Sequence, residues 1–285
     1  MFKKLVLAII LLAGSASATS AALHYAHRED AEKADSLIKM ASADRSASLG
    51  DRMAMIAESF VGSGKDDYYY KDSVATLRVN LQEFTPMTFI NTVEALARTA
   101  GDGNPGIVQF EDNLRKVSCR RGEDAGFPSL MWHASDWIGD NLYRGNITEL
   151  TERYGDQRDR TKSLDYLTRN RDKYAALANA ETYDKVRMTE MGFRSHKIPY
   201  LPKQFIGKKA FEEDARPGDI IIMVPNEDGQ DIFQIGILTL EEGEPHLIHF
   251  DVKKGMVVKE SEPLKRYFNL VSKYFGGFRW LRIKE

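Results

Sequence analysis

Residues 219–260 read DIIIMVPNEDGQDIFQIGILTLEEGEPHLIHFDVKKGMVVKE, and this stretch decides the fold class. Its β-branched, apolar runs lie at 219–224, 231–240, 245–250 and 255–260 and are separated by turns rich in Gly, Pro, Asn and Asp. Such spacing predicts an antiparallel meander of strands. The segment GGFRWLRIKE at 276–285 predicts one further strand.

The chain before Pro199 has a different period, because its apolar residues recur at helical spacing. The loop at 62–73, GSGKDDYYYKDS, is expected to be solvated with partly packed tyrosine rings, although the rings could also form a ligand wall. The expected helices lie at 32–43, 50–62, 129–145, 163–179 and 180–195, with another that begins at Pro86 and is ended by Gly101 and Gly103.

Helices followed by an antiparallel meander indicate an α+β fold, with N-terminal helices packed on an antiparallel β-sheet. No repeat or linker divides the chain. We therefore expect a single domain at 23–285, helical over about 23–198 and β-rich over about 199–285.

Residues 1–22 have the features of a secretory signal peptide. Lys3 and Lys4 precede a short apolar run, and small residues follow it. The run is too short to span a bilayer, so no integral membrane segment is expected after cleavage, and the protein should be periplasmic or secreted. Loss of the two lysines changes the net charge from −2 to −4, and no basic block remains to favour nucleic acid.

Metal and cofactor motifs are absent from the sequence, which predicts neither a metal nor a cofactor. His246 and His249 should point to opposite faces of a strand, whereas Asp251 shares a face with His249 and could orient it. A half-buried strand histidine is the other interpretation. Cys119, the only cysteine, excludes an intramolecular disulfide. Its flanking arginines could activate it, but a small core residue is the more common role.

Seven segments, taken in order along the chain, form a recognisable set. They are VNLQEFTPMTFINTVEALAR (79–98), SDWIGDN (135–141), TKSLDYLTRNRDKYAAL (161–177), IPYLPK (198–203), RPGDIIIMV (216–224), QDIFQIGIL (230–238) and HLIHF (246–250). Their order resembles a known family, the N-acetylmuramoyl-L-alanine amidase-like branch of the NlpC-type, papain-related cysteine hydrolases. The resemblance implies a papain-like core, a peptidoglycan fragment (an amino sugar carrying a short peptide) as ligand, and a cysteine nucleophile with a histidine base.

Two catalytic positions depart from the family pattern. Pro86 stands where the family has its cysteine, and Gln234 stands where it has its histidine, while His249 falls on the retained third position. Leu130 replaces a family arginine, and the next two family residues appear in reversed order. By resemblance, the candidate ligand-binding residues are Trp132, His133, Tyr200, Lys203 and Asp231.

The Pro86 substitution has a simple physical interpretation. The positive end of a helix stabilises a cysteine thiolate placed there. A helix start that carries no thiolate is an ordinary first turn. Thr85 is a good N-cap for such a turn, and proline is a favoured first helical residue. Proline is no nucleophile, and glutamine cannot transfer a proton near neutral pH. The sequence thus favours an inactive amidase-like protein that binds muropeptides. The alternatives are an active amidase using Cys119 or an activated water, and an interaction partner without a sugar ligand.

Overall fold

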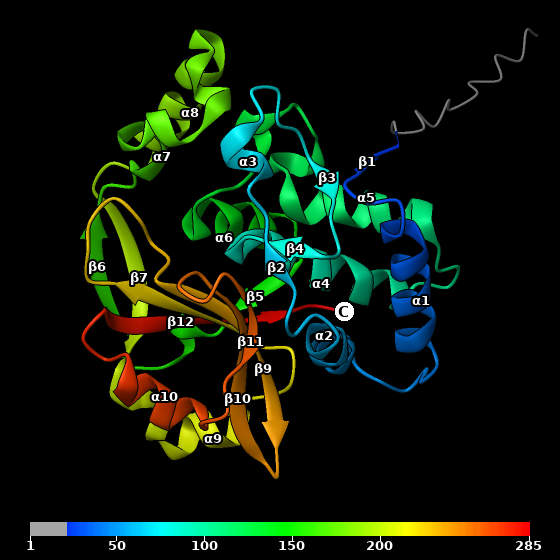
Figure 1. Cartoon of the computed structure of the whole chain (residues 1–285). Coiled ribbons are helices and arrows are strands. Elements are labelled where there is room, and N and C mark those ends of the chain that lie inside the picture. The colour runs from blue at the N-terminus through cyan, green and yellow to red at the C-terminus, as the bar shows by residue number, and fades with distance from the viewer. Residues whose placement is uncertain (1–21) are drawn as a thin grey trace, which may run out of the picture.

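A computed structural model describes residues 22–285, so the expected signal peptide at 1–22 lies outside the described residues except for its last position. An antiparallel sheet of eight strands occupies the middle of the molecule, in the order β11-β10-β9-β8-β12-β7-β6 with β5 paired to β12 (Figure 1). Its strands are β5 (Ile147–Glu149), β6 (Arg158–Lys162), β7 (His196–Pro202), β8 (Ile220–Pro225), β9 (Gln234–Glu241), β10 (Glu244–Asp251), β11 (Met256–Lys259) and β12 (Phe275–Ile283).

The predicted meander is confirmed, because β8, β9, β10 and β11 are neighbours in the sheet in chain order. The predicted last strand is also confirmed as β12, which lies between β8 and β7. Gly236 on β9 has to be glycine, since a Cβ there would lie 2.7 Å from the carbonyl oxygen of Ile248 on the neighbouring strand. This close approach holds β9 and β10 together beside the site described below.

Two-stranded parallel pairs, β1 with β3 and β2 with β4, lie outside the main sheet. They are β1 (His24–Tyr25), β2 (Gly64–Lys65), β3 (Arg78–Val79) and β4 (Glu83–Phe84). The helices are α1 (Asp30–Ser42), α2 (Leu49–Glu58), α3 (Tyr68–Lys71), α4 (Pro86–Gly101), α5 (Ile107–Ser118), α6 (Ala134–Tyr143), α7 (Tyr166–Arg169), α8 (Ala180–Met191), α9 (Lys209–Asp214) and α10 (Leu264–Leu270).

The sheet is buried on both faces, which explains the unbroken apolar run of β8. Ile220 and Ile222 pack into one cluster with α2, α4 and α5, while Ile221 and Met223 pack into another with α9 and α10. Figure 1 shows these two groups of helices on opposite sides of the sheet. Successive strand residues point to opposite faces, so a strand covered on both sides must be apolar throughout.

The long helix expected at 163–179 is wrong. The structure has only α7 there, followed by 3-10 helices at Arg171–Lys173 and Ala175–Ala178. The Asn170 side-chain amide donates to the carbonyl of Tyr166 (2.7 Å), and the Arg171 guanidinium donates to the carbonyl of Leu177 (2.8 Å). Side-chain donors that take backbone carbonyls compete with the helical ladder.

The sequence also missed α5 and placed β5 and β6 in the helical half. The β6 sequence, RDRTK, is mostly exposed and has no apolar alternation to reveal a strand. No helix in the described part of the chain, 22–285, is both long and apolar enough to cross a membrane.

Candidate ligand-binding site

The start of helix α4 is built as the sequence predicted. Thr85 is the N-cap, and Pro86 is the first helical residue. The Thr85 hydroxyl accepts from the amide of Thr88 (3.3 Å), and the Thr88 hydroxyl accepts from the amide of Thr85 (2.8 Å). This reciprocal capping box satisfies the amides that a helix start leaves without partners, so the turn holds its shape without a cysteine.

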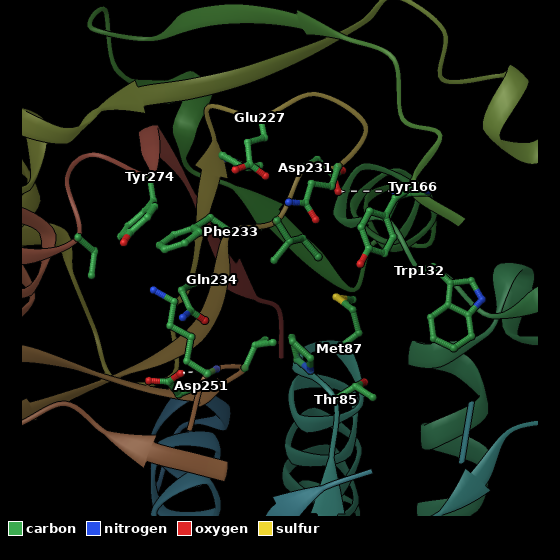
Figure 2. A pocket seen from close by; sticks show the side chains of 18 of the residues that line it. Thr85, Met87, Trp132, Tyr166, Glu227, Asp231, Phe233, Gln234, Asp251 and Tyr274 are labelled. Atoms are coloured by element: carbon green, nitrogen blue, oxygen red, sulfur yellow. Dashed lines mark hydrogen bonds and ion pairs between the residues drawn. The ribbon is translucent and has the colours of Figure 1, made fainter. Parts of the chain in front are cut away.

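A cavity of about 660 Å³ lies in front of this helix start. Its floor includes Pro86, Met87 and Gln234, and Figure 2 shows the Met87 sulfur pointing into it. Trp132 and Tyr166 stand on one side, and Phe233 and Tyr274 stand on the opposite side (Figure 2). The volume is that of a pocket for a small ligand. Tyr70 and Tyr174, stacked with ring centroids 5.1 Å apart, complete the aromatic wall, so the tyrosine loop contributes Tyr70 to the cavity wall.

A buried polar chain runs behind the cavity floor. His249 is fully buried; its Nδ1 lies 3.2 Å from Oε1 of Gln234, and its Nε2 lies 2.8 Å from Oε1 of Glu260. Pro86 and Gln234 line the same cavity, so the predicted degenerate positions and His249 are brought together. The carboxylate that orients His249 is therefore Glu260 rather than Asp251.

Sequence reasoning missed Glu260, although the strand register accounts for it. His249 pairs with Val258 across β10 and β11. Glu260 lies two residues beyond Val258, and alternate residues of a strand share a face, so Glu260 is a diagonal neighbour of His249. The hairpin register that brings them together depends on a turn the sequence does not specify uniquely.

Asp231 joins the cavity wall to helix α6. Its buried carboxylate accepts from the amides of Ala134 (3.1 Å) and Ser135 (2.6 Å), the first residues of that helix. It therefore acts as an N-cap supplied from a distant part of the chain, and its negative charge opposes the positive end of the helix. His133, the residue before α6, has its Nδ1 3.9 Å from the same carboxylate.

The other nitrogen of His133, Nε2, lies 3.0 Å from Oε1 of Glu190 on α8. Burial by itself lowers the pKa of His133, but the hydrogen bond to Glu190 and the charge of Asp231 outweigh it, so the pKa is raised above its ordinary value. Burial raises the pKa of Glu190, yet hydrogen bonds from His133 and Thr168 leave it lowered. Each partner therefore favours the charged form of the other at the edge of the cavity.

Glu190 also fixes the cavity wall. Its carboxylate accepts from the amide of Leu167 (2.9 Å) and from the amide of Thr168 (3.1 Å) at the first turn of α7. Since Tyr166 and Leu167 line the cavity, the position of this wall depends on a carboxylate from α8. Nothing in the sequence signalled Glu190, because it comes from a distant, mostly exposed helix.

The predicted ligand-binding residues divide into two groups. Trp132, His133 and Asp231 line the cavity, whereas Tyr200 and Lys203 are not among its lining residues. Lys203 Nζ donates to the carbonyl of Ser272 (2.6 Å), and Tyr200 packs beside Ile198 and Val224. Neither Tyr200 nor Lys203 therefore contributes to the cavity wall, contrary to the expectation from the sequence.

Cys119 is a core residue. It is fully buried behind helix α5, is absent from the cavity lining, and pairs with Leu130 in an isolated β-bridge. Burial raises the pKa of its thiol to about 12, so the flanking arginines do not activate it. The described cavity lining contains no cysteine and no serine. Trp137, on helix α6, is likewise fully buried.

The comparison with protein families identifies the architecture around this cavity. A family model described as AmiA-like, N-acetylmuramoyl-L-alanine amidase-like, matches residues 65–273. The chain belongs to this amidase-like family. The match includes the helix start at Pro86, the cavity wall at Asp231 and the strand residue His249, and it ends one residue before Tyr274 of the cavity lining. No curated protein matches the chain.

Solved structures share the fold of this family member. An N-acetylmuramoyl-L-alanine amidase from Bacteroides uniformis has 24% identity and a TM-score of 0.73, over 83% of this chain and 99% of that one. A Bacteroides fragilis protein provisionally named a xylanase has 27% identity and a TM-score of 0.69, over 80% and 99%. A Legionella pneumophila protein has 14% identity and a TM-score of 0.67, over 89% and 95%.

Proposed function

We propose that this amidase-like protein is exported, has a papain-like core of the NlpC type, and binds a peptidoglycan fragment without hydrolysing it. The ligand is an amino sugar carrying a short peptide. The observation that carries the proposal is the cavity of about 660 Å³, which is open in front of a helix start occupied by Thr85 and Pro86.

The absence of hydrolysis follows from the side chains at the cavity floor. Amide cleavage by this family's chemistry needs a nucleophile activated by an adjacent base. Pro86 offers no nucleophilic atom, the amide of Gln234 cannot accept a proton near neutral pH, and Cys119 is buried with its thiol pKa raised to about 12. The alternative of an active amidase with Cys119 as relocated nucleophile is not supported by this placement.

Binding does not depend on the missing groups. Most ground-state contacts to a ligand come from residues that take no part in the chemistry. The cavity combines an aromatic wall with a few fixed polar groups, among them Gln234 and Asp231, which is the usual composition of a small-molecule site. An aromatic wall and ordered polar groups also favour a sugar-peptide ligand over the second alternative, a protein partner without sugar.

The test combines calorimetry with mass spectrometry on the chain lacking residues 1–22. N-acetylmuramoyl-L-alanyl peptides should bind and remain intact after prolonged incubation. Tyr166→Ala, in the cavity wall, should weaken binding by roughly five-fold or more. Tyr143→Ala is the matched control, because Tyr143 is 91% exposed and outside the cavity lining.

Each outcome separates the hypotheses. Release of free peptide by the parent protein would refute inactivity, and its loss in Cys119→Ala would assign the nucleophile. Failure of every muropeptide to bind would refute the binding role and support an interaction partner. Equal binding by Tyr166→Ala and Tyr143→Ala would place the ligand outside this cavity.

A further inference from the structure

The cavity has a cationic corner opposite its aromatic wall. We define the lysine corner as Lys253, Lys254, Lys273 and Tyr274, which come from the β10–β11 turn and from the connection between α10 and β12. The Nζ of Lys253 lies 4.6 Å from the ring centroid of Tyr274, and the Nζ of Lys273 lies 4.8 Å from it. Tyr274, Lys253 and Lys254 line the cavity.

The charges of this corner are largely unbalanced within the protein. Lys254 lies 3.8 Å from the carboxylate of Asp251, but neither Lys253 nor Lys273 has a carboxylate partner in the described part of the chain. Two ammonium groups thus meet at one phenol ring without an anion between them. A carboxylate entering this corner would receive charge-assisted hydrogen bonds and would neutralise the excess charge.

The corner is also held in position. The Tyr274 ring stacks on Phe233, with centroids 5.2 Å apart and planes 18° apart, and Phe233 in turn stacks on Phe275 of the core. Figure 2 shows Tyr274 and Phe233 side by side across the cavity from Trp132 and Tyr166. A fixed platform limits the entropy lost when a ligand is bound.

The electrostatic state of Tyr274 supports the same interpretation. Its hydrogen bond with Lys273, together with the charges of Lys253 and Lys273, lowers the pKa of the phenol below its ordinary value against the opposing effect of burial. A potential that favours a phenolate favours a ligand carboxylate for the same reason. The side of the cavity toward Trp132 and Tyr166 carries Asp231, whereas the carboxylate beside the corner, Asp251, is the partner of Lys254.

We propose that the lysine corner is the subsite for a carboxylate of the bound fragment, so that the carboxyl-bearing peptide end points to Tyr274 and the sugar lies toward Trp132 and Tyr166. This inference rests on the proposed function and adds to it the orientation of the ligand and a requirement for a free carboxylate. A ligand with both ends neutral gains nothing from the corner, and a ligand bound in reverse would bring its carboxylate toward Asp231.

The experiment varies the ligand and the protein independently. Calorimetry at low salt compares N-acetylmuramoyl-L-alanyl-D-glutamic acid with its diamide. The protein variants are the double change Lys253→Gln with Lys273→Gln and a matched double change, Lys116→Gln with Lys197→Gln. The control lysines are exposed and lie outside the cavity lining, and their replacement removes the same amount of charge. All four changes are at exposed residues, so folding should be retained.

The free acid should bind the parent roughly ten-fold more tightly than the diamide, since each of two exposed ion pairs makes a modest contribution to affinity. The corner variant should lose this preference, while the control variant keeps it. In the parent, saturating acid should raise the pKa of Tyr274, followed by NMR of ring-labelled tyrosine and assigned with Tyr274→Phe. The preference should also decrease with rising salt, because the corner is exposed.

Two failures remain distinguishable. If the parent binds acid and diamide equally, or if both double variants lose the same affinity, the carboxylate subsite is refuted while the binding role stands. If the parent binds neither compound, the proposed function fails and the subsite with it. Should the corner variant fold poorly, equal binding of acid and diamide by the parent would still refute the subsite, and a Tyr274 pKa raised by the acid but not by the diamide would support it.

Discussion

Replacement of Asp231 by alanine should destabilise the fold as well as the cavity wall. Its buried carboxylate accepts two hydrogen bonds, from the amides of Ala134 and Ser135. A hydrogen bond to a charged group contributes about 1.5–3 kcal/mol. The two hydrogen bonds share one carboxylate, so their contributions do not add in full, and water can reach part of the space that the side chain leaves. We therefore expect a total loss of about 3 kcal/mol in the free energy of unfolding. Asp231→Asn keeps one acceptor and should lose about half as much.

The assay is equilibrium urea unfolding followed by circular dichroism. Asp228→Ala is the matched control. Asp228 is exposed on the same connection between β8 and β9, and its replacement removes the same charge. The control should stay within about 0.5 kcal/mol of the parent. An Asp231→Ala variant as stable as the Asp228→Ala variant would refute the role of Asp231 as a cap for helix α6, and with it the argument that this wall of the cavity is fixed.

Other perturbations test the remaining groups. The double change Pro86→Cys with Gln234→His should give weak but measurable muropeptide cleavage by mass spectrometry, while either change alone gives none, because nucleophile and base act as a unit; cleavage by a single variant would contradict this. The raised pKa of His133 means that its stabilisation is complete below its ordinary value of 6.5 and is lost as the pH rises through its folded-state pKa. The lowered pKa of Glu190 means that its own contribution is present above the ordinary value of 4.5 and is lost at lower pH. The difference in free energy of unfolding between the parent and His133→Gln, measured by urea unfolding at pH 5 to 9, should therefore be largest between pH 4.5 and 6.5 and should shrink above pH 6.5. A difference that does not change with pH would show that His133 is not an imidazolium. Cys119 should not react with a thiol reagent at pH 8 until urea unfolds the chain, because it is buried with a pKa raised to about 12; rapid labelling of the native protein would reopen its role as a nucleophile.

Local patterns allowed much of the fold to be predicted from the sequence. The meander followed from β-branched runs separated by turn residues, and the start of α4 followed from the intrinsic preferences of Thr85 and Pro86 for N-cap and first-turn positions. In both cases the decisive interactions lie within a few residues. The amidase-like resemblance added the prediction that Pro86, Gln234 and His249 lie together. No local sequence pattern connects these three residues.

The parts that could not be predicted depend on contacts between distant segments. Asp231 caps a helix that begins almost a hundred positions earlier, and Glu190 holds the first turn of α7 from another helix. Tyr200 and Lys203 were placed in the site by segment matching alone, yet strand β7 and its end direct them elsewhere. Periodicity assigns a residue to a face of an element but does not say which other element will cover that face.

The polar side chains at the cavity floor are locally satisfied. A site that merely decays is expected to leave buried polar groups without partners, which is costly. In the part of the chain that the structure describes, no side-chain atom of Gln234, His249 or Glu260 is a buried atom without a partner. Proline at the first helical turn limits the freedom of the unfolded chain, which stabilises the fold by about 0.4–1 kcal/mol. Pro86 and Gln234 are therefore each compatible with their surroundings, as the proposed binding role requires.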